Sequence, residues 1–378
     1  MRSSGTACSR VVVLAVAAAF MPFHGHAGPM QCTHLPVVSA DGERITGIED
    51  MALDGANNRV LLSAYDRHAV DEALASGITE GVTVPEGGLY WLGLEQLEVS
   101  PVTSLSATRI AVFAETPVRL LPHGIGLFDH DGVRRLGLVN RVVTPDGISG
   151  EVLFFDAAGT DFQLTGRAGG DAFCRANDVV VVDSATTLVT YDQANCDGWA
   201  LWAERAFDRH SAGVLRVTFG TAGVADTRTV FDSVAFANGI TLDTRGRIVF
   251  AASRDSAVYA LTGEALLQGD RDATVMVRFQ GGPDNITVNE SGALIVAVHP
   301  SPFALFLHMN GLTGVPTSRV VAVAPDGTTT LLVDADTPGV PGAATTALEA
   351  AGKLIVSSAW DHGLGVCTPV MPSAADRG

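Results

Sequence analysis

Short apolar segments with a two-residue alternation recur along most of the chain and predict β-strands. They are rich in β-branched residues and are bounded by turn sequences such as Pro145-Asp146-Gly147 and Pro325-Asp326-Gly327. The clearest are residues 109–114, 136–143, 152–155, 179–182, 214–219, 247–252, 294–298, 319–323 and 354–358. Successive side chains of a strand point to opposite faces, so this pattern favours antiparallel strands joined by hairpins. The one predicted helix, 66–76, lies in an insertion that runs to about residue 102.

A short polar element precedes several of the apolar segments. It occurs at 47–50, 123–126, 176–179, 237–240 and 283–286, with a weaker sixth copy at 344–347. The copies lie 46 to 74 residues apart, which fits propeller blades of about 40–50 residues with loop insertions. We therefore expect an all-β, six-bladed β-propeller formed by residues 28–378 as one domain. The alternative is a Greek-key sandwich or two small β domains, in which the polar pairs are ordinary turn residues.

In a propeller the innermost strand of each blade starts at the rim of the central channel, so these polar residues would meet there. They comprise four carboxylates and three amides: Glu49, Asp50, Asn177, Asp178, Asn238, Asp284 and Asn285. Oxygen ligands of this kind suit calcium, whereas zinc would recruit imidazole or thiolate groups. We expect calcium at the axis, because repetition of the element distinguishes it from an isolated turn.

The N-terminus has the pattern of a secretory signal peptide over residues 1–27. Arg2 and Arg10 precede the apolar run 11–20, and small residues follow it. That run is too short to span a membrane, and no later apolar stretch is long enough, so we expect a secreted or periplasmic protein without a membrane span. Removal of residues 1–27 changes the net charge from −17 to −19. This acidity argues against nucleic-acid binding; it is compatible with cation binding and equally with a solvated acidic surface.

Four cysteines remain outside the predicted signal peptide: Cys32, Cys174, Cys196 and Cys367. An oxidising compartment favours disulfides between them. A bond from the first to the last would close a ring of blades, and the other two could form a second bond. Four cysteines allow three pairings, and the sequence does not choose among them.

The chain resembles the paraoxonase/arylesterase family and, more distantly, regucalcin/gluconolactonase and strictosidine synthase-like propellers. The similarity lies in segments that keep the family's order and approximate spacing: 48–50, 122–125, 176–179, 236–240, 284–286 and 299–300. It spans nearly all of residues 28–378, with weak similarity between the segments. The resemblance implies a ring-closing disulfide between Cys32 and Cys367.

The resemblance further implies two calcium ions. The upper, catalytic ion would be held by Glu49, Asn177, Asn238, Asp284 and Asn285. A deeper, structural ion would be held by Asp50, Asp178 and the backbone carbonyl of Ile125. Each adjacent pair, such as Glu49 and Asp50, could serve both ions, because neighbouring side chains of an extended segment point in opposite directions.

His123 matches the family's histidine that activates water, a role that suits an imidazole titrating near neutrality. His299 matches another active-site histidine and is expected at the channel mouth; either could instead be a packed histidine. Arg141 is a departure, because animal members of the family have a second histidine there. Arginine is a poor base but could bind a carboxylate or an oxyanion. No Gly-x-Ser-x-Gly sequence is present, which argues against a serine hydrolase.

The predicted activity is therefore calcium-dependent hydrolysis of a small-molecule lactone or ester. Alternatives are a gluconolactonase-like sugar lactonase and a non-catalytic, calcium-stabilised propeller that binds a ligand or a partner protein. Residues 66–102 and 301–316 are expected to shape the channel entrance, or to pack in outer strands. The second segment includes Phe303, Phe306, His308 and Met309. Neither the substrate nor the oligomeric state is indicated by the sequence.

Overall fold

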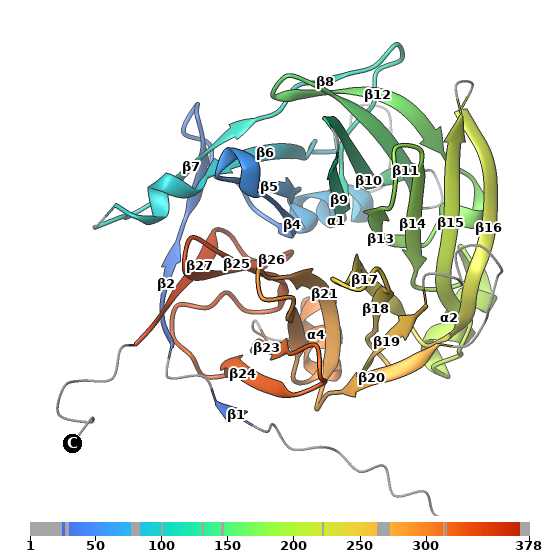
Figure 1. Cartoon of the computed structure of the whole chain (residues 1–378). Coiled ribbons are helices and arrows are strands. Elements are labelled where there is room, and N and C mark those ends of the chain that lie inside the picture. Colours follow the sequence, from blue (N-terminus) through green and yellow to red (C-terminus); the bar gives the residue numbers. More distant parts are fainter. Residues whose placement is uncertain are drawn as a thin grey trace, which may run out of the picture.

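Six small sheets form a ring around a central channel (Figure 1), so the protein is a six-bladed β-propeller as predicted. The computed structural model describes residues 25–26, 30–76, 84–99, 101–130, 132–144, 147–220, 223–262, 273–312, 314 and 316–370. Most of the predicted signal peptide lies outside this part. Its two described residues form strand β1 (Gly25–His26), which pairs with Thr330 and Leu331.

The blades follow one another in chain order, and the strands of each blade are named from the channel outward. Blade 1 contains β4 (Ile48–Asp54), β5 (Arg59–Ala64), β6 (Gly88–Gly93), β7 (Leu105–Arg109) and β3 (Val37–Ser39). Blade 2 contains β9 (Pro122–His130), β10 (Val133–Thr144), β11 (Gly147–Ala158), β12 (Asp161–Ala168) and β8 (Val112–Phe113). Blade 3 contains β13 (Ala176–Val181), β14 (Thr186–Tyr191), β15 (Ala212–Gly220) and β16 (Gly223–Val234).

The second half of the ring has the same plan. Blade 4 contains β17 (Ala237–Leu242), β18 (Ile248–Ala252), β19 (Ala257–Leu261) and β20 (Thr274–Arg278). Blade 5 contains β21 (Gly282–Val288), β22 (Leu294–His299), β23 (Arg319–Val323), β24 (Thr329–Val333) and β1. Blade 6 contains β25 (Ala344–Ala350), β26 (Lys353–Ser358), β27 (Leu364–Pro369) and β2 (Met30–Leu35).

Both ends of the chain meet in blade 6, which closes the ring. Cys32 of β2 lies opposite Cys367 of β27, and the two form a disulfide. The predicted ring-closing bond is thus confirmed. The remaining cysteines, Cys174 and Cys196, form a second disulfide.

The apolar core is divided among the interfaces between neighbouring blades. Leu61 of blade 1 packs with Leu138 of blade 2, for example, and Leu348 of blade 6 packs with Ile48 of blade 1. Similar clusters join blades 2 and 3, 3 and 4, 4 and 5, and 5 and 6. Because each sheet buries both faces against its neighbours, no blade holds its own core.

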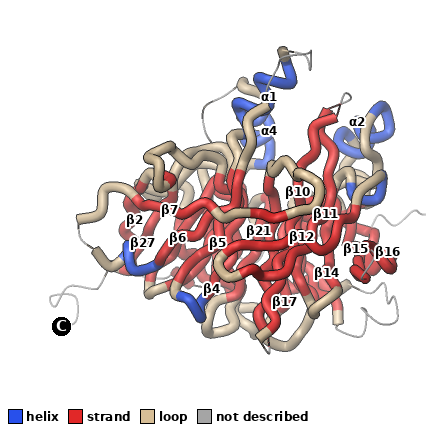
Figure 2. Tube along the Cα trace, turned by 90° about the horizontal axis from the view of Figure 1, so that it is seen from above, coloured by secondary structure: helices blue, strands red, loops and turns tan. Residues whose placement is uncertain are grey.

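The helices among the described residues rise on one side of the ring, which we call the upper face (Figure 2). They are α1 (Arg67–Ala75), α2 (Gly198–Ala206) and α4 (Pro302–Met309). Short 3-10 turns are η1 (Gly55–Asn57), η2 (Leu94–Leu97) and η3 (Asp171–Phe173). Within the described residues, no helix is long and apolar enough to cross a membrane.

The predicted helix at 66–76 is confirmed as α1, which Asp66 caps by accepting from the Ala69 amide. The expectation that everything else is antiparallel β was wrong in two respects. Helices α2 and α4 interrupt blades 3 and 5, and α4 begins with a Ser301 cap and Pro302, both typical of a helix start. In addition, β3, β8 and β1 each join the outer edge of a blade in parallel, because these segments reach their sheets from a neighbouring part of the ring.

Two strand predictions were also displaced. The segment 109–114 is split between the end of β7 and the two-residue β8, with no continuous strand. The weak sixth element lies within β25, the innermost strand of blade 6, while 353–358 is the second strand. Each polar element therefore begins an innermost strand itself.

Candidate functional site

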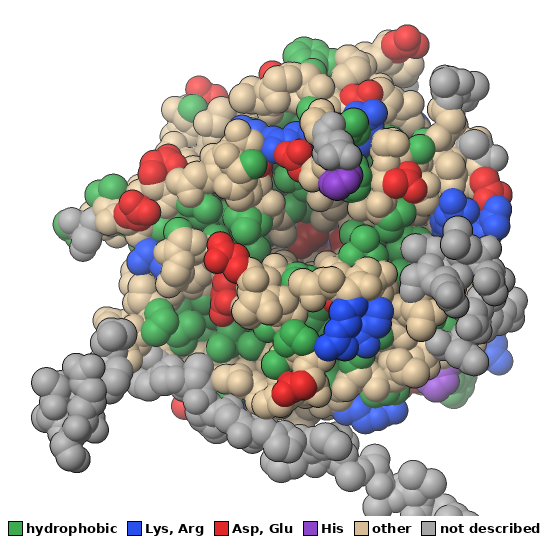
Figure 3. Space-filling view, viewed as in Figure 1, with side chains coloured by type: hydrophobic (Ala, Val, Ile, Leu, Met, Phe, Trp, Pro, Cys, Tyr) green, Lys and Arg blue, Asp and Glu red, His purple; other side chains and the backbone are tan. Residues whose placement is uncertain are grey.

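The predicted ligands meet around the upper end of the channel because the six innermost strands all begin there. The neighbouring strands β4, β9, β13, β17, β21 and β25 contact one another in sequence around the ring. Their polar residues are buried: Glu49, Asn177, Asn238, Asp284 and Asn285 are all at most 6% exposed. Figure 3 views the face opposite the helices, where the centre of the ring is hollowed and acidic side chains are visible at its floor.

Three asparagine amide oxygens at this point have no hydrogen-bond partner although they are buried: Oδ1 of Asn177, Asn238 and Asn285. Their orientation is partly set by the amide nitrogens. Nδ2 of Asn238 donates to Ser253 Oγ at 3.1 Å, and Nδ2 of Asn285 donates to Thr346 Oγ1 at 2.9 Å. A buried acceptor without a partner costs about 1–3 kcal/mol of folding free energy. Three such oxygens together therefore indicate that a cation binds here.

Glu49 lies between a cation and a histidine. Its Oε2 accepts a 2.7 Å hydrogen bond from Arg67 of α1, and its Oε1 lies 3.4 Å from His123 Nδ1. Burial raises the pKa of Glu49 to about 7, and Arg67 opposes that rise. Arg67 also packs against the Tyr65 ring, with its guanidinium carbon 4.3 Å from the ring centre. Sequence reasoning missed Arg67, because nothing in a surface-helix pattern marks one arginine as buried.

Asp50 and Asp178 occupy equivalent positions deeper in the channel. Asp50 Oδ2 accepts from the Ile125 amide of the next blade at 2.9 Å, and Asp178 Oδ2 accepts from the Ile240 amide of the next blade at 2.7 Å. Burial raises the pKa of Asp50 to about 6 and that of Asp178 well above its usual value. These carboxylates connect adjacent blades, and the Ile125 carbonyl remains a predicted ligand.

Hydroxyl groups support the polar strand starts, and two of them, those of Ser63 and Thr190, were not expected from the sequence. Ser63 donates to the His123 carbonyl at 2.6 Å, and Thr190 donates to the Asn238 carbonyl at 2.5 Å. In blade 6, Thr345 and Thr346 donate to the Glu49 carbonyl at 2.7 and 2.9 Å. The weak sixth copy of the element therefore completes the ring with hydroxyls. The sequence signal that could have revealed Ser63 and Thr190 is their matching place in the second strand of blades 1 and 3.

The two predicted active-site histidines are buried beside carboxylates. His123 is 9% exposed, and its Nδ1 has no hydrogen-bond partner at the 3.4 Å separation from Glu49. Burial and then the charge of Arg141 hold the pKa of His123 well below its usual value, so the ring is neutral at physiological pH. Nε2 of His299 lies 2.7 Å from Asp284 Oδ2.

Of the expected entrance segments, helices α1 and α4 lie on the upper face, whereas residues 88–97 of the first segment form β6 of blade 1 and the turn η2. On α4, Phe303, Phe306 and Met309 are 69%, 55% and 48% exposed, whereas His308 is buried. The His308 ring lies 6.1 Å from that of His68 on α1, so the two helices touch.

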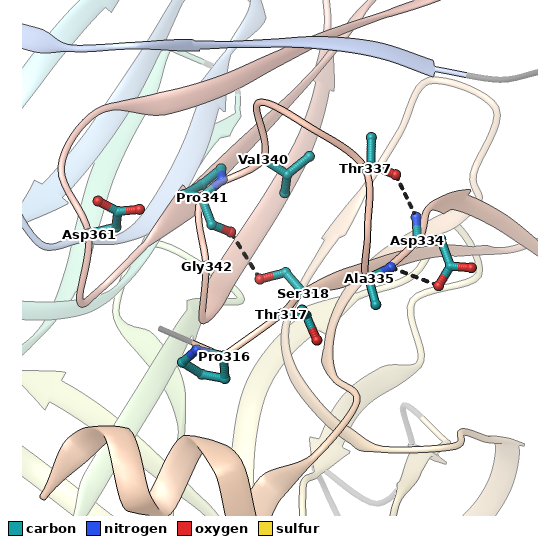
Figure 4. A pocket seen from close by; sticks show the side chains of 10 residues that line it. All are labelled: Pro316, Thr317, Ser318, Asp334, Ala335, Thr337, Val340, Pro341, Gly342 and Asp361. Carbon is teal, nitrogen blue, oxygen red and sulfur yellow. Dashed lines mark hydrogen bonds between the residues drawn. The ribbon is translucent and has the colours of Figure 1, made fainter. Parts of the chain in front are cut away.

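A polar cavity of about 260 Å³ lies between connections of blades 5 and 6 (Figure 4). Its lining includes Ser318, Thr337 and Asp361 and contains none of the predicted calcium ligands. Ser318 donates to the Pro341 carbonyl at 3.0 Å and accepts from the Ala344 amide, so its hydroxyl is already engaged. The unpartnered oxygens at the channel therefore define the candidate site better than this cavity does.

The residues present fit a hard cation. Within the described part of the chain, no three His, Cys, Asp or Glu side chains form a metal-binding group. The donor set instead relies on amide oxygens, three of which are buried without partners, together with Glu49 and Asp284. Mixed carboxylate and amide oxygens are the ligands that calcium accepts.

Comparison with known proteins identifies the family. A family-level sequence profile described as arylesterase matches residues 83–364, more than half of the chain. The protein therefore belongs to the arylesterase family of propeller hydrolases. No curated protein matched the sequence.

Solved structures with a similar fold include a luciferin-regenerating enzyme, at 14% identity and a TM-score of 0.50, covering 86% of this chain and 92% of that one. Another is a structural-genomics target provisionally assigned as a gluconolactonase, at 12% identity and a TM-score of 0.49, covering 91% of this chain and 94% of that one. At 14% identity, the similarity to the luciferin-regenerating enzyme shows a shared fold alone.

Proposed function

We propose that the protein is a calcium-dependent hydrolase of small lactones or carboxylic esters, with lactones preferred. The observation that carries the proposal is the set of three buried, unpartnered asparagine oxygens beside Glu49 and Asp284. Calcium bound by these five residues would polarise the substrate carbonyl and stabilise negative charge on its oxygen. The family assignment supports hydrolysis, and the substrate class is our inference.

His123 would accept the proton of the attacking water. Its ring is neutral because burial depresses its pKa, so the imidazole can take up a proton. Glu49 Oε1, 3.4 Å away, would favour the protonated ring that follows. His299 would act as a positioning residue, because its hydrogen bond to Asp284 fixes the orientation of that carboxylate.

Calcium removal tests the metal requirement. The purified protein is assayed on a panel of lactones and aryl esters before and after chelation, with elemental analysis of both samples. We expect activity to disappear with the metal and to return on addition of calcium. Activity that persists in protein without detectable calcium would refute the proposal, whereas calcium-dependent stability with no turnover would indicate a non-catalytic propeller.

Elemental analysis also addresses the number of ions. We expect two per chain, the second held by Asp50 and Asp178 below the first. Both carboxylates already accept backbone hydrogen bonds, but carboxylate oxygens have further lone pairs to offer. A single ion per chain would mean that the lower pair serves only to join blades.

His123→Gln tests the proton acceptor. The amide keeps the approximate size but cannot take a proton at neutral pH, so we expect kcat to fall at least tenfold with unchanged calcium content. His210→Gln is the control, because that histidine is exposed and pairs with Asp255, and neither residue is a proposed ligand. Unchanged turnover in the His123 variant would remove it from the mechanism.

We also propose that the protein works outside the cytoplasm, in the periplasm or as a secreted protein. The signal-like N-terminus and the two disulfides support this, because such bonds persist in oxidising compartments. Detection of the mature N-terminus near residue 28 in an exported fraction is the expected result.

A further inference from the structure

Arg141 is a buried cation without a carboxylate partner. It lies on β10 and is 8% exposed, and its Nη1 donates to the Ala176 carbonyl at 2.7 Å. Among the described residues, no Asp or Glu side chain forms an ion pair with it. The other buried arginine, Arg67, is held by Glu49 at 2.7 Å, and the half-buried Arg175 is held by Asp192 at 3.2 Å. Burial of an unpaired charge is costly, so Arg141 calls for an anion that the chain does not supply.

The position of Arg141 places that anion beside the proposed active site. Ala176, whose carbonyl it contacts, directly precedes the candidate ligand Asn177. Among the charged groups around His123, Arg141 lowers the pKa of that histidine most, and its charge also lowers the pKa of Glu49. The guanidinium therefore lies at the junction of blades 2 and 3, near the group expected to activate water.

The neighbouring charges leave Arg141 available for a ligand. Asp192 is close enough for its charge to attract the Arg141 guanidinium, but Arg175 already binds Asp192. Arg67 is occupied by Glu49 and by the Ala359 carbonyl. A guanidinium presents paired N–H groups whose geometry matches a carboxylate, and such charge-assisted hydrogen bonds are stronger than neutral ones.

We propose that Arg141 is a specificity-determining residue that binds a carboxylate carried by the substrate, so that the preferred substrates are anionic lactones or esters. This inference rests on the proposed hydrolase function for the identity of the reacting group. The carboxylate it describes is a second group on the substrate, distinct from the carbonyl that is attacked.

The kinetic test compares a γ-butyrolactone bearing a carboxylate substituent with its carboxamide counterpart. We expect the calcium-loaded wild-type protein to favour the carboxylate by about ten- to a hundredfold in kcat/KM, the range for a charge-assisted hydrogen bond. In Arg141→Gln this ratio should fall by at least tenfold, mainly through KM of the anionic substrate. No preference in the wild type, or an equal loss on both substrates in the variant, would overturn the proposal.

Two further variants separate charge recognition from structural damage. Arg141→Lys keeps the charge but lacks the planar fork, so we expect an intermediate preference. Arg254→Gln removes a cation after β18 of blade 4 that is already paired with the exposed Asp208, so the preference should remain. Thermal unfolding of each variant checks that it is folded. A preference lost equally in the Arg254 variant would show a general field effect and contradict a specific role for Arg141.

A binding measurement distinguishes failure of this inference from failure of the hydrolase proposal. Glutarate and glutaramide are titrated calorimetrically into the calcium-loaded wild-type and Arg141→Gln proteins. We expect glutarate alone to bind, and only to the wild type. If no lactone is hydrolysed but glutarate binding depends on Arg141, the anion site stands and the hydrolase proposal fails. If neutral lactones are hydrolysed and glutarate does not bind, the anion site is refuted.

Discussion

At the scale of single residues, the site is defined by polar atoms whose needs the chain does not meet. The amide oxygens of Asn177, Asn238 and Asn285 lack donors, and Arg141 lacks a carboxylate. Elsewhere, buried polar groups such as Asn140 are well satisfied: its Oδ1 accepts from the Leu121 amide and its Nδ2 donates to Glu151. Because buried polar groups are usually paired, three unpartnered amide oxygens at neighbouring strand starts point to a ligand there.

The buried carboxylates predict an inverse dependence of stability on pH when metal is absent. The pKa of Glu49 is raised from 4.5 to about 7 and that of Asp50 from 3.8 to about 6, mainly by burial. The folded protein then holds protons that the unfolded chain releases, so the contribution of these two groups to stability is greatest below about pH 4 and is lost as pH rises to about 7. Calcium favours the charged forms and should therefore stabilise more at pH 8 than at pH 5.

Thermal unfolding of chelated and calcium-loaded protein at pH 5 and pH 8 measures this effect. The melting temperature of the chelated protein should be lower at pH 8 than at pH 5, and the gain from calcium should be larger at pH 8. An equal gain at both values would mean that these carboxylates are not ligands.

At the scale of elements, the innermost strands alternate between large and small residues at one position. This position is the second residue of the polar pair at the start of each strand. Asp50, Asp178 and Asn285 occupy blades 1, 3 and 5, whereas Gly124, Gly239 and Thr346 occupy blades 2, 4 and 6. The alternation has a steric cause. A Cβ on Gly124 would lie 2.3 Å from Asp178 Oδ1, and one on Gly239 would lie 2.4 Å from the Cα of Asn285.

Gly239→Ala tests the close approach of blades 4 and 5. The added methyl would meet backbone atoms, so β21 must shift and carry Asn285 with it. We expect a loss of about 1–3 kcal/mol in stability and weaker calcium binding. Gly169→Ala is the control, because a Cβ there has no neighbour within 4 Å. Calcium titration followed by unfolding compares the two, and wild-type affinity in the Gly239 variant would contradict the steric explanation.

At the scale of the whole molecule, the ring depends on closure between its first and last blades. The Cys32–Cys367 bond joins residues separated by 335 positions, whereas Cys174–Cys196 spans 22. Each blade shares its core with both neighbours, so opening blade 6 from blade 1 exposes apolar surface on both.

Removing each disulfide should therefore have different effects. By loop-closure entropy, the long bond stabilises by about 5–6 kcal/mol and the short one by about 3 kcal/mol. We expect the Cys32→Ser/Cys367→Ser double variant to lose more stability to denaturant than Cys174→Ser/Cys196→Ser. Chemical unfolding of both, beside the wild type, measures the difference; equal losses would show that blade 6 stays closed through β2–β27 pairing alone.

Much of the architecture was predictable because strand patterns and turn signals are local properties of the chain. The spacing of the polar elements predicted six blades, and their oxygen-bearing residues predicted one polar centre. Helix α2 was missed although Ala200, Leu201 and Ala203 favour a helix, since nine residues are too few to stand out among strand signals. The pairing of Cys32 with Cys367 followed from the family resemblance, because spacing alone allows three arrangements.

Only the tertiary structure decided which partners these residues have. The Arg67–Glu49 ion pair joins a surface insertion to the channel, and the isolation of Arg141 depends on Arg175 holding Asp192. Such relations arise when blades distant in sequence pack together, so no local pattern records them. The chain's own pattern thus specifies the blades and the chemistry at their starts, whereas packing around the axis determines which polar atoms are left for a ligand.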